Sequence, residues 1–139
     1  VPACKRWGLG LLTWSPLAGG FLTGKYQRDK SAPGGTRYDK MKERFESRNT
    51  DRNWAILDTV TTVAKELNAT PTQVSLAWLL RKPAVSSVIV GARSVAQLED
   101  SLKAVDLALP DDAMERLGKV SAPQLYYPYD FMKGIDGSW

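Results

Sequence analysis

The stretch VSSVIVGARSVAQLEDSL, residues 85–102, reads as a strand, a tight turn and a capped helix. Its first six residues are β-branched at four positions, which is typical of a strand. Gly91 then lets the backbone turn closely, and Ser94 with Gln97 has the spacing of a capping box that opens a helix. We therefore predict a strand over 85–90 and a helix directly after the turn. The apolar side of this helix comprises Leu98, Leu102 and Val105.

The junction of this strand and helix is the stronger of two candidate ligand sites. Free backbone amides at a helix N-terminus attract anions, and Arg93 adds a fixed, fork-shaped donor that suits phosphate. The physics is that of dinucleotide sites, although no GxGxxG motif is present. The alternative is an ordinary turn between a strand and a helix, with Arg93 in solvent.

Three helices and one more strand surround this unit. The apolar run Leu9–Trp14 predicts a short strand that Pro16 ends. The predicted helices cover 54–67, the segment from Thr70 to Pro83, and 109–120. The middle helix begins at a capping box of Thr70 and Gln73, with Pro71 at its first position.

This order of elements predicts an α/β fold. The two strands are separated by helices, and strands connected in that way pair in parallel. Parallel sheets are normally larger than two strands and covered on both faces. The sequence therefore reads as part of a larger object.

The glycine-rich stretch GGFLTGKY, residues 19–26, is the second candidate site. It resembles a phosphate loop, but Tyr26 stands where Ser or Thr would hold magnesium, and no helix begins there. Gly19, Gly20 and Gly24 permit close approach of the backbone to a ligand, with Lys25 beside it as a cation. The alternative is a plain turn between a strand and a loop.

Most of the excess positive charge lies between Lys25 and Arg52. We weigh a solvated, mobile surface segment against a basic rim around a bound anion. Nucleic-acid binding ranks last, because acids alternate with the bases and no aromatic stacking pattern accompanies them. The whole region 17–50 lacks a clear period and is too long for a simple connection, so we expect a functional loop or a flap.

The bulk composition limits the remaining possibilities. The chain has 139 residues, the size of one domain, and a net charge of +4. It contains no histidine, which excludes triads and zinc sites built on imidazole, and we expect no metal. The single cysteine, Cys4, fits a reducing cytosol. Because no signal peptide or membrane-length apolar run is visible, we expect a cytoplasmic protein with no membrane or nucleic-acid partner.

Four segments in order resemble the C-terminal half of an aldo-keto reductase of the bacterial and potassium-channel β-subunit-like branch. They are WSPLAGGFLTGKY (14–26), TPTQVSLAWLL (70–80), VIVGARSVAQLEDSL (88–102) and YYPYDFMKGIDGSW (126–139). The resemblance implies that residues 1–139 form the C-terminal portion of one (β/α)₈ TIM-barrel domain. Residues 9–16 and 85–90 would be its last two strands, 17–50 a long loop and 121–139 the C-terminal tail.

The same resemblance implies which residues bind NADPH. Trp14 would lie against the nicotinamide, and Gly91 and Arg93 would hold the adenosine phosphate. Arg93 is also compatible with a 2′-phosphate, which favours NADPH over NADH. The pyrophosphate path would be lined by Ser15, Pro16, Leu17 and Gly19, with Lys25 nearby. The residues facing the ribose phosphate and adenine would be Gln97, Asp100 and Ser101; the family often has Asn in place of Ser101.

The reaction that the resemblance implies is hydride transfer from the nicotinamide to an aldehyde or ketone. The proton-donating tyrosine and its lysine, aspartate and histidine partners belong to the N-terminal half of the barrel, so we expect no catalytic residue in this chain. We therefore predict the NADPH-binding half of an oxidoreductase, inactive alone, which acquires the missing strands from an N-terminal half or a second copy. The alternative is a non-catalytic NADP(H)-binding regulatory module. The aromatic tail either shapes the substrate pocket or packs as a strap.

Overall fold

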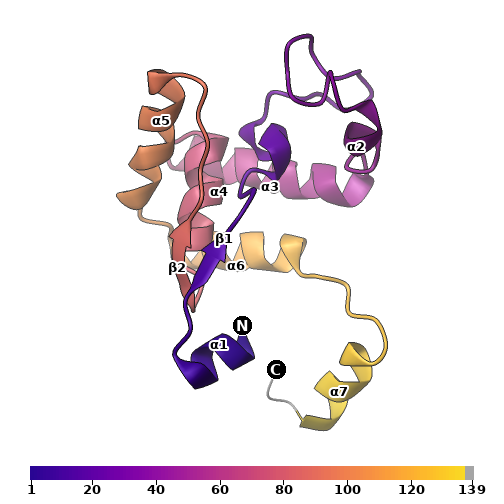
Figure 1. Ribbon diagram of the computed structural model, residues 1–139, viewed down its shortest axis with the longest axis vertical. Helices are drawn as coiled ribbons and strands as arrows, with labels where there is room; N and C mark the ends of the chain where they lie inside the picture. The colour runs from indigo at the N-terminus through magenta and orange to yellow at the C-terminus, as the bar shows by residue number, and fades with distance from the viewer. Residues whose placement is uncertain (137–139) are drawn as a thin grey trace.

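The computed structural model describes residues 1–136. The strands are β1 (Leu11–Thr13) and β2 (Val85–Val88). The α-helices are α1 (Pro2–Trp7), α2 (Lys42–Glu46), α3 (Asp51–Glu66), α4 (Pro71–Leu80), α5 (Val95–Leu102), α6 (Asp111–Ser121) and α7 (Tyr129–Asp136). Two short 3₁₀ helices, η1 (Ala18–Thr23) and η2 (Lys103–Val105), complete the chain (Figure 1).

The two strands pair in parallel, which confirms the α/β prediction. The register places Leu12 opposite Ser87 and Thr13 opposite Val88. Both strands are shorter than predicted, and β1 ends at Thr13 because Ser15, with a φ of 56°, turns the chain soon after it. The carboxyl ends of both strands point toward the end of the molecule where α5 and the 17–50 loop lie (Figure 1). This end is where α/β proteins place their ligands.

The main hydrophobic core lies among α3, α4, η2 and α6. On α3, Val60, Val63 and Ala64 are buried in this core. This helix begins earlier than predicted because Thr50 caps it: its hydroxyl accepts a hydrogen bond from the backbone N–H of Asn53. Helix α4 is buried over a continuous run, as expected for a helix that is apolar nearly all round. That run is Gln73, Val74, Ser75, Leu76 and Ala77.

A second, aromatic core lies in the 17–50 loop. The rings of Phe21, Tyr26, Tyr38 and Phe45 are buried together against Trp54 of α3. Neighbouring rings contact one another with centroid separations of 4.8 to 6.2 Å, a spacing typical of favourable aromatic pairs. The basic segment 25–52 is therefore not wholly solvated, because Tyr26, Tyr38 and Phe45 within it are buried. Its aromatic side chains form a core, and its charged side chains remain outside.

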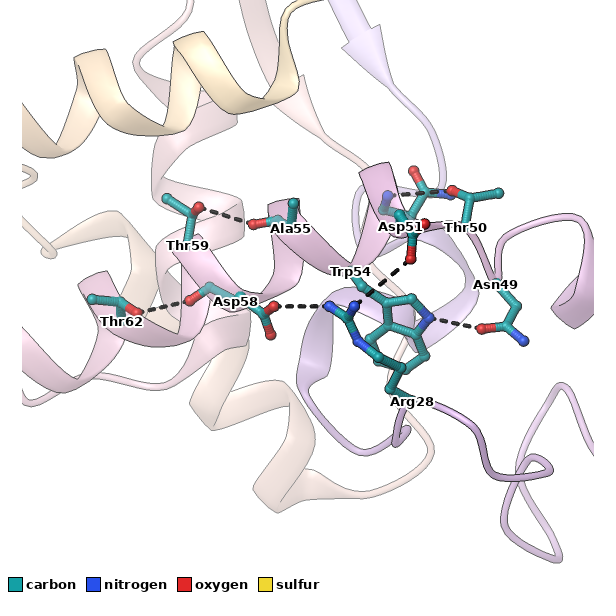
Figure 2. Close-up of polar contacts among 10 residues, drawn as sticks. Arg28, Asn49, Thr50, Asp51, Trp54, Ala55, Asp58, Thr59 and Thr62 are labelled. Carbon is teal, nitrogen blue, oxygen red and sulfur yellow. Dashed lines mark hydrogen bonds and ion pairs between the residues drawn. The ribbon is translucent and has the colours of Figure 1, made fainter.

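Polar contacts attach this loop to α3 (Figure 2). The Arg28 guanidinium lies 3.1 Å from a carboxylate oxygen of Asp58 and 3.7 Å from one of Asp51. It also lies over the indole ring of Trp54, whose N–H donates to the side-chain oxygen of Asn49 at 2.7 Å. These contacts therefore attach the loop to the first turns of α3 at two points, at Arg28 and at Asn49 near its end.

The ends of the chain carry two helices that the sequence did not predict, α1 and α7. Helix α7 lies apart from the core, at the end of an extended segment that follows α6 (Figure 1). Aromatic side chains near both ends are exposed, among them Trp7, Tyr126, Tyr127, Tyr129 and Phe131. Over residues 122–131 the side chains are exposed and do not pack over the core as a strap, and residues 137–139 lie outside the described range.

Over residues 1–136, no helix combines the length and the apolar character that crossing a bilayer requires. Within the same range, no cluster of three or more potential metal-ligating side chains occurs.

Candidate functional site

A cleft of about 710 Å³ opens at the carboxyl ends of β1 and β2. Its walls come from the segment after β1, the middle of the 17–50 loop, and the turn and helix after β2. All eleven residues that the resemblance assigns to a cofactor line this one cleft. They are Trp14, Ser15, Pro16, Leu17, Gly19, Lys25, Gly91, Arg93, Gln97, Asp100 and Ser101.

The wall after β1 depends on two consecutive glycines. Gly19 and Gly20 have φ angles of +69° and +93°, which other residues adopt only with strain. A Cβ on Gly20 would also lie 2.6 Å from the ammonium nitrogen of Lys25. The glycines therefore turn the chain after Leu17 and leave the space in which the Lys25 side chain lies.

The wall after β2 is organised by the start of α5. The hydroxyl of Ser94 accepts a hydrogen bond from the backbone N–H of Gln97 at 3.3 Å, as the capping box predicts. The second half of the box differs from the prediction: the Gln97 side-chain oxygen accepts from the backbone N–H of Arg93, at 2.9 Å, and not from that of Ser94. This bond fixes the backbone of Arg93 at the mouth of the cleft.

Four basic side chains line the cleft: Lys25, Arg37, Lys40 and Arg93. Partial burial, followed by the nearby Arg93 cation, lowers the pKa of Lys25 from its ordinary value. Arg93 also donates to the backbone oxygen of Gly35 across the cleft, at 3.3 Å. The cleft is therefore strongly electropositive, which suits an anion with several charges.

Nine lining residues lie outside the eleven that the resemblance assigns, although Gly20 was part of the glycine-rich candidate site. They are Gly20, Thr23, Gly35, Thr36, Arg37, Lys40, Thr72, Ile89 and Val90. Arg37 and Lys40 belong to the basic segment 25–52, for which a rim around an anion was one of the two main interpretations. The charge excess was the signal that could have found them. The positions of Arg37 and Lys40 depend on the aromatic core of the loop, and that core was not predicted from the sequence.

An indole ring and a carboxylate complete the lining. Trp14 is 75% exposed at the mouth of the cleft, so one face of its ring is free for a planar ligand group. The Asp100 carboxylate accepts hydrogen bonds from the side chains of Thr70 and Gln73 on the neighbouring helix.

The tyrosines of the chain lie outside the cleft. Tyr26 and Tyr38 are buried in the aromatic core of the loop, and the Tyr38 hydroxyl donates to the backbone oxygen of Ala18 at 2.6 Å. Tyr126, Tyr127 and Tyr129 are exposed in the tail. None of the five is among the residues that line the cleft.

Fold and cleft together define a class of protein: an α/β protein with a basic ligand cleft at the carboxyl ends of parallel strands. Over residues 1–122 the sequence matches the profile of the aldo/keto reductase family. The chain belongs to the aldo/keto reductase family, and the resemblance seen in the sequence is confirmed.

The relatives of the chain include one protein of a bacterium and one of a plant. The chain is similar to the uncharacterized oxidoreductase YrpG of Bacillus subtilis (strain 168), with 35% identity over 120 residues, which cover 86% of this chain and 34% of YrpG. It is 37% identical over 114 residues to a probable voltage-gated potassium channel subunit beta of Arabidopsis thaliana, covering 77% of this chain and 33% of that protein. The chain thus spans about a third of the length of the curated relatives that it matches.

Proposed function

We propose that the cleft binds NADPH and that the chain is the cofactor-binding part of an enzyme that reduces aldehydes or ketones. One observation carries the proposal: eleven residues assigned from the sequence, spread over 14–25 and 91–101, line a single basic cleft. The volume of about 710 Å³ lies within the range of small-molecule sites, which is roughly 300–1,000 Å³. Four cations and the backbone amides of a helix N-terminus match the phosphate groups of the dinucleotide.

Each part of the cleft has a role in this proposal. The exposed ring of Trp14 would stack on the nicotinamide, and the turn from Ser15 to Gly19 would follow the pyrophosphate. Arg93 and Lys25 would hold phosphate oxygens, while residues of α5 would contact the ribose phosphate and adenine. When bound, NADPH supplies a hydride to the carbonyl carbon of the substrate. The chain's own residues would bind and orient the cofactor for that transfer.

We place β1 and β2 as the last two strands of a barrel and residues 1–139 as its C-terminal part. Support comes from the matched family and from the apolar side chains that remain exposed along the sheet, Leu12, Trp14 and Ile89. The proton-donating residues would then lie on another segment, either an N-terminal barrel half or a second copy. On this basis, the chain alone binds cofactor without reducing a carbonyl.

Titration with NADPH tests the proposal, with tryptophan fluorescence as the signal for binding. Replacing Arg93 by Ala removes a charge-assisted contact worth about 1.5–3 kcal/mol, so the dissociation constant should rise by roughly tenfold or more. The matched control is Arg116→Ala, because Arg116 lies on α6, outside the cleft, and pairs with Glu66 and Asp112. Affinity should also fall with added salt, which screens the exposed cations.

The same samples separate the two halves of the proposal. Binding of NADPH without reduction of an added aldehyde supports both. Reduction by the chain alone would show that a proton donor is present, against the placement of the chemistry on another segment. Failure to bind NADPH, or an affinity that Arg93→Ala leaves unchanged, would refute the cofactor site.

A further inference from the structure

The turn after β1, which forms one wall of the cleft, is strained at a residue that is not glycine. Ala18 has a φ of 50°, and Gly19 and Gly20 follow it in the same left-handed region. Glycine adopts this conformation freely, and asparagine or aspartate can support it with a side-chain hydrogen bond, but alanine has neither advantage. Strained residues persist only where the surrounding structure holds them. A contact that holds Ala18 is therefore expected.

The hydroxyl of Tyr38 makes that contact. It donates to the backbone oxygen of Ala18 at 2.6 Å, although the two residues are 20 positions apart in the sequence. Tyr38 is 2% exposed, and its ring packs against those of Tyr26 and Phe45 at centroid distances of 5.3 and 5.8 Å. Burial raises the pKa of Tyr38 above its ordinary value, so the hydroxyl keeps its proton at neutral pH. The donor of this bond is thus held in place by its ring.

The same residue also fixes a second wall of the cleft. Arg37 and Lys40, which flank Tyr38 in the sequence, are exposed and line the cleft. Neither Tyr38 nor Ala18 is among the lining residues. The Tyr38 side chain therefore joins the two walls from outside the ligand space.

We propose that Tyr38 is a positioning residue, whose buried hydroxyl holds the turn at 18–20 against the segment 37–40 and so sets two walls of the cleft before a phosphate-bearing ligand enters. A preformed cleft binds more tightly, because less conformational freedom is lost on binding. The inference rests on the proposed function, since it takes the cofactor phosphates as the ligand. Tyr38 acts through the backbone of the turn and does not touch the ligand itself.

The substitution Tyr38→Phe removes the hydroxyl and keeps the ring, so it tests the hydrogen bond alone. A neutral hydrogen bond contributes a net factor of roughly two to ten to an equilibrium constant. We expect the dissociation constant for NADPH, measured by tryptophan fluorescence on the full chain, to rise by about fivefold. A rise of less than about twofold would overturn the proposal.

The matched control is Tyr26→Phe, because it removes the same group from the same aromatic core. The hydroxyl of Tyr26 is buried and has no hydrogen-bond partner among residues 1–136. Tyr26 does not line the cleft, and phenylalanine keeps a ring at the place where the Lys25 ammonium lies 5.2 Å from the centroid. The control should therefore bind NADPH with wild-type affinity. An equal loss of affinity in both variants would overturn the role of the bond to Ala18.

A second control separates positioning from general stability. Val63→Ala weakens the main hydrophobic core on α3, where Val63 is fully buried and outside the cleft. Under conditions in which circular dichroism shows every variant to be folded, Val63→Ala should leave the NADPH dissociation constant unchanged while it lowers the urea midpoint. A residue that only stabilised the fold would behave in the same way. A Tyr38→Phe variant that matches Val63→Ala in affinity would therefore contradict the proposal.

Amide hydrogen exchange tests the turn in the absence of ligand. The backbone N–H of Gly20 donates to the oxygen of Leu17 at 2.9 Å, so its exchange rate reports local opening of the turn. Tyr38→Phe should speed this exchange by about fivefold, whereas Tyr26→Phe and Val63→Ala should leave it unchanged. An unchanged rate in Tyr38→Phe would overturn the proposal. A wild-type chain that does not bind NADPH refutes the proposed function instead, while the exchange rates still decide whether Tyr38 holds the turn, so the two failures are distinguishable.

Discussion

Replacing Gly19 by Ala should destabilise the chain through two separate effects. Gly19 has a φ of +69°, and a non-glycine residue in this left-handed region costs about 1–2 kcal/mol. Its Cβ would also lie 2.6 Å from the hydroxyl oxygen and 2.9 Å from the adjoining ring carbon of Tyr38. Tyr38 is 2% exposed and packed among other rings, so it cannot move aside without breaking the hydrogen bond to Ala18. That bond contributes about 0.5–1.5 kcal/mol, so the total loss is about 1.5–3.5 kcal/mol.

Gly35 offers a matched control for this prediction. Its φ of +72° is almost the same, but a Cβ there would meet no atom within 4 Å. Gly35→Ala should therefore lose only the strain of about 1–2 kcal/mol, and both variants gain the same small benefit from a stiffer unfolded chain. Urea unfolding of the two variants should differ by about 1 kcal/mol, with Gly19→Ala the less stable. Equal losses would show that Tyr38 yields freely, and that the aromatic core does not fix the loop.

Three further outcomes follow from the same contacts. Burial and the nearby Arg93 cation lower the pKa of Lys25. The affinity for NADPH should therefore fall as the pH rises from neutral toward that pKa. NADPH titrations over a series of pH values should show a smaller fall for Lys25→Arg. Val63→Ala removes two methyl groups from a fully buried side chain, and urea unfolding should show a loss of about 1–3 kcal/mol. Arg116→Ala breaks an exposed pair with Glu66 and should lower the urea midpoint less than Val63→Ala does.

Local patterns predicted those parts of the fold that depend on near neighbours in the sequence. The capping box of Thr70 and Gln73 forms as its spacing indicates, because both partners lie within one helical turn. Parallel pairing of the strands also followed from their order along the chain. The box at Ser94 shows the limit of such patterns. Its spacing is compatible with two backbone N–H donors to the Gln97 side chain, those of Ser94 and Arg93. The conformation of the preceding turn determines that Arg93 is the donor.

The 17–50 loop could not be predicted from periodicity. Phe21, Tyr26, Tyr38 and Phe45 are separated by 5, 12 and 7 residues, and no helix or strand period brings them together. Their burial depends on α3, which supplies Trp54 from outside the loop. The places of Arg37 and Lys40 at the cleft depend in turn on that core. Composition indicated a basic segment, while tertiary packing determined which of its cations reach the cleft.

A cleft that receives an anion must keep the protein's own acids away from its cations. The acids near this cleft are engaged elsewhere: Asp39 accepts from the backbone N–H of Gly35 at 2.9 Å, and Asp100 is held by α4. Asp51 and Asp58, both on α3, pair with Arg28 of the 17–50 loop (Figure 2). The acids interleaved with the basic residues therefore do not cancel the charge of the cleft. They contact a backbone N–H or side chains elsewhere, and that arrangement leaves the cleft cations without carboxylate partners among the side chains that the structure describes.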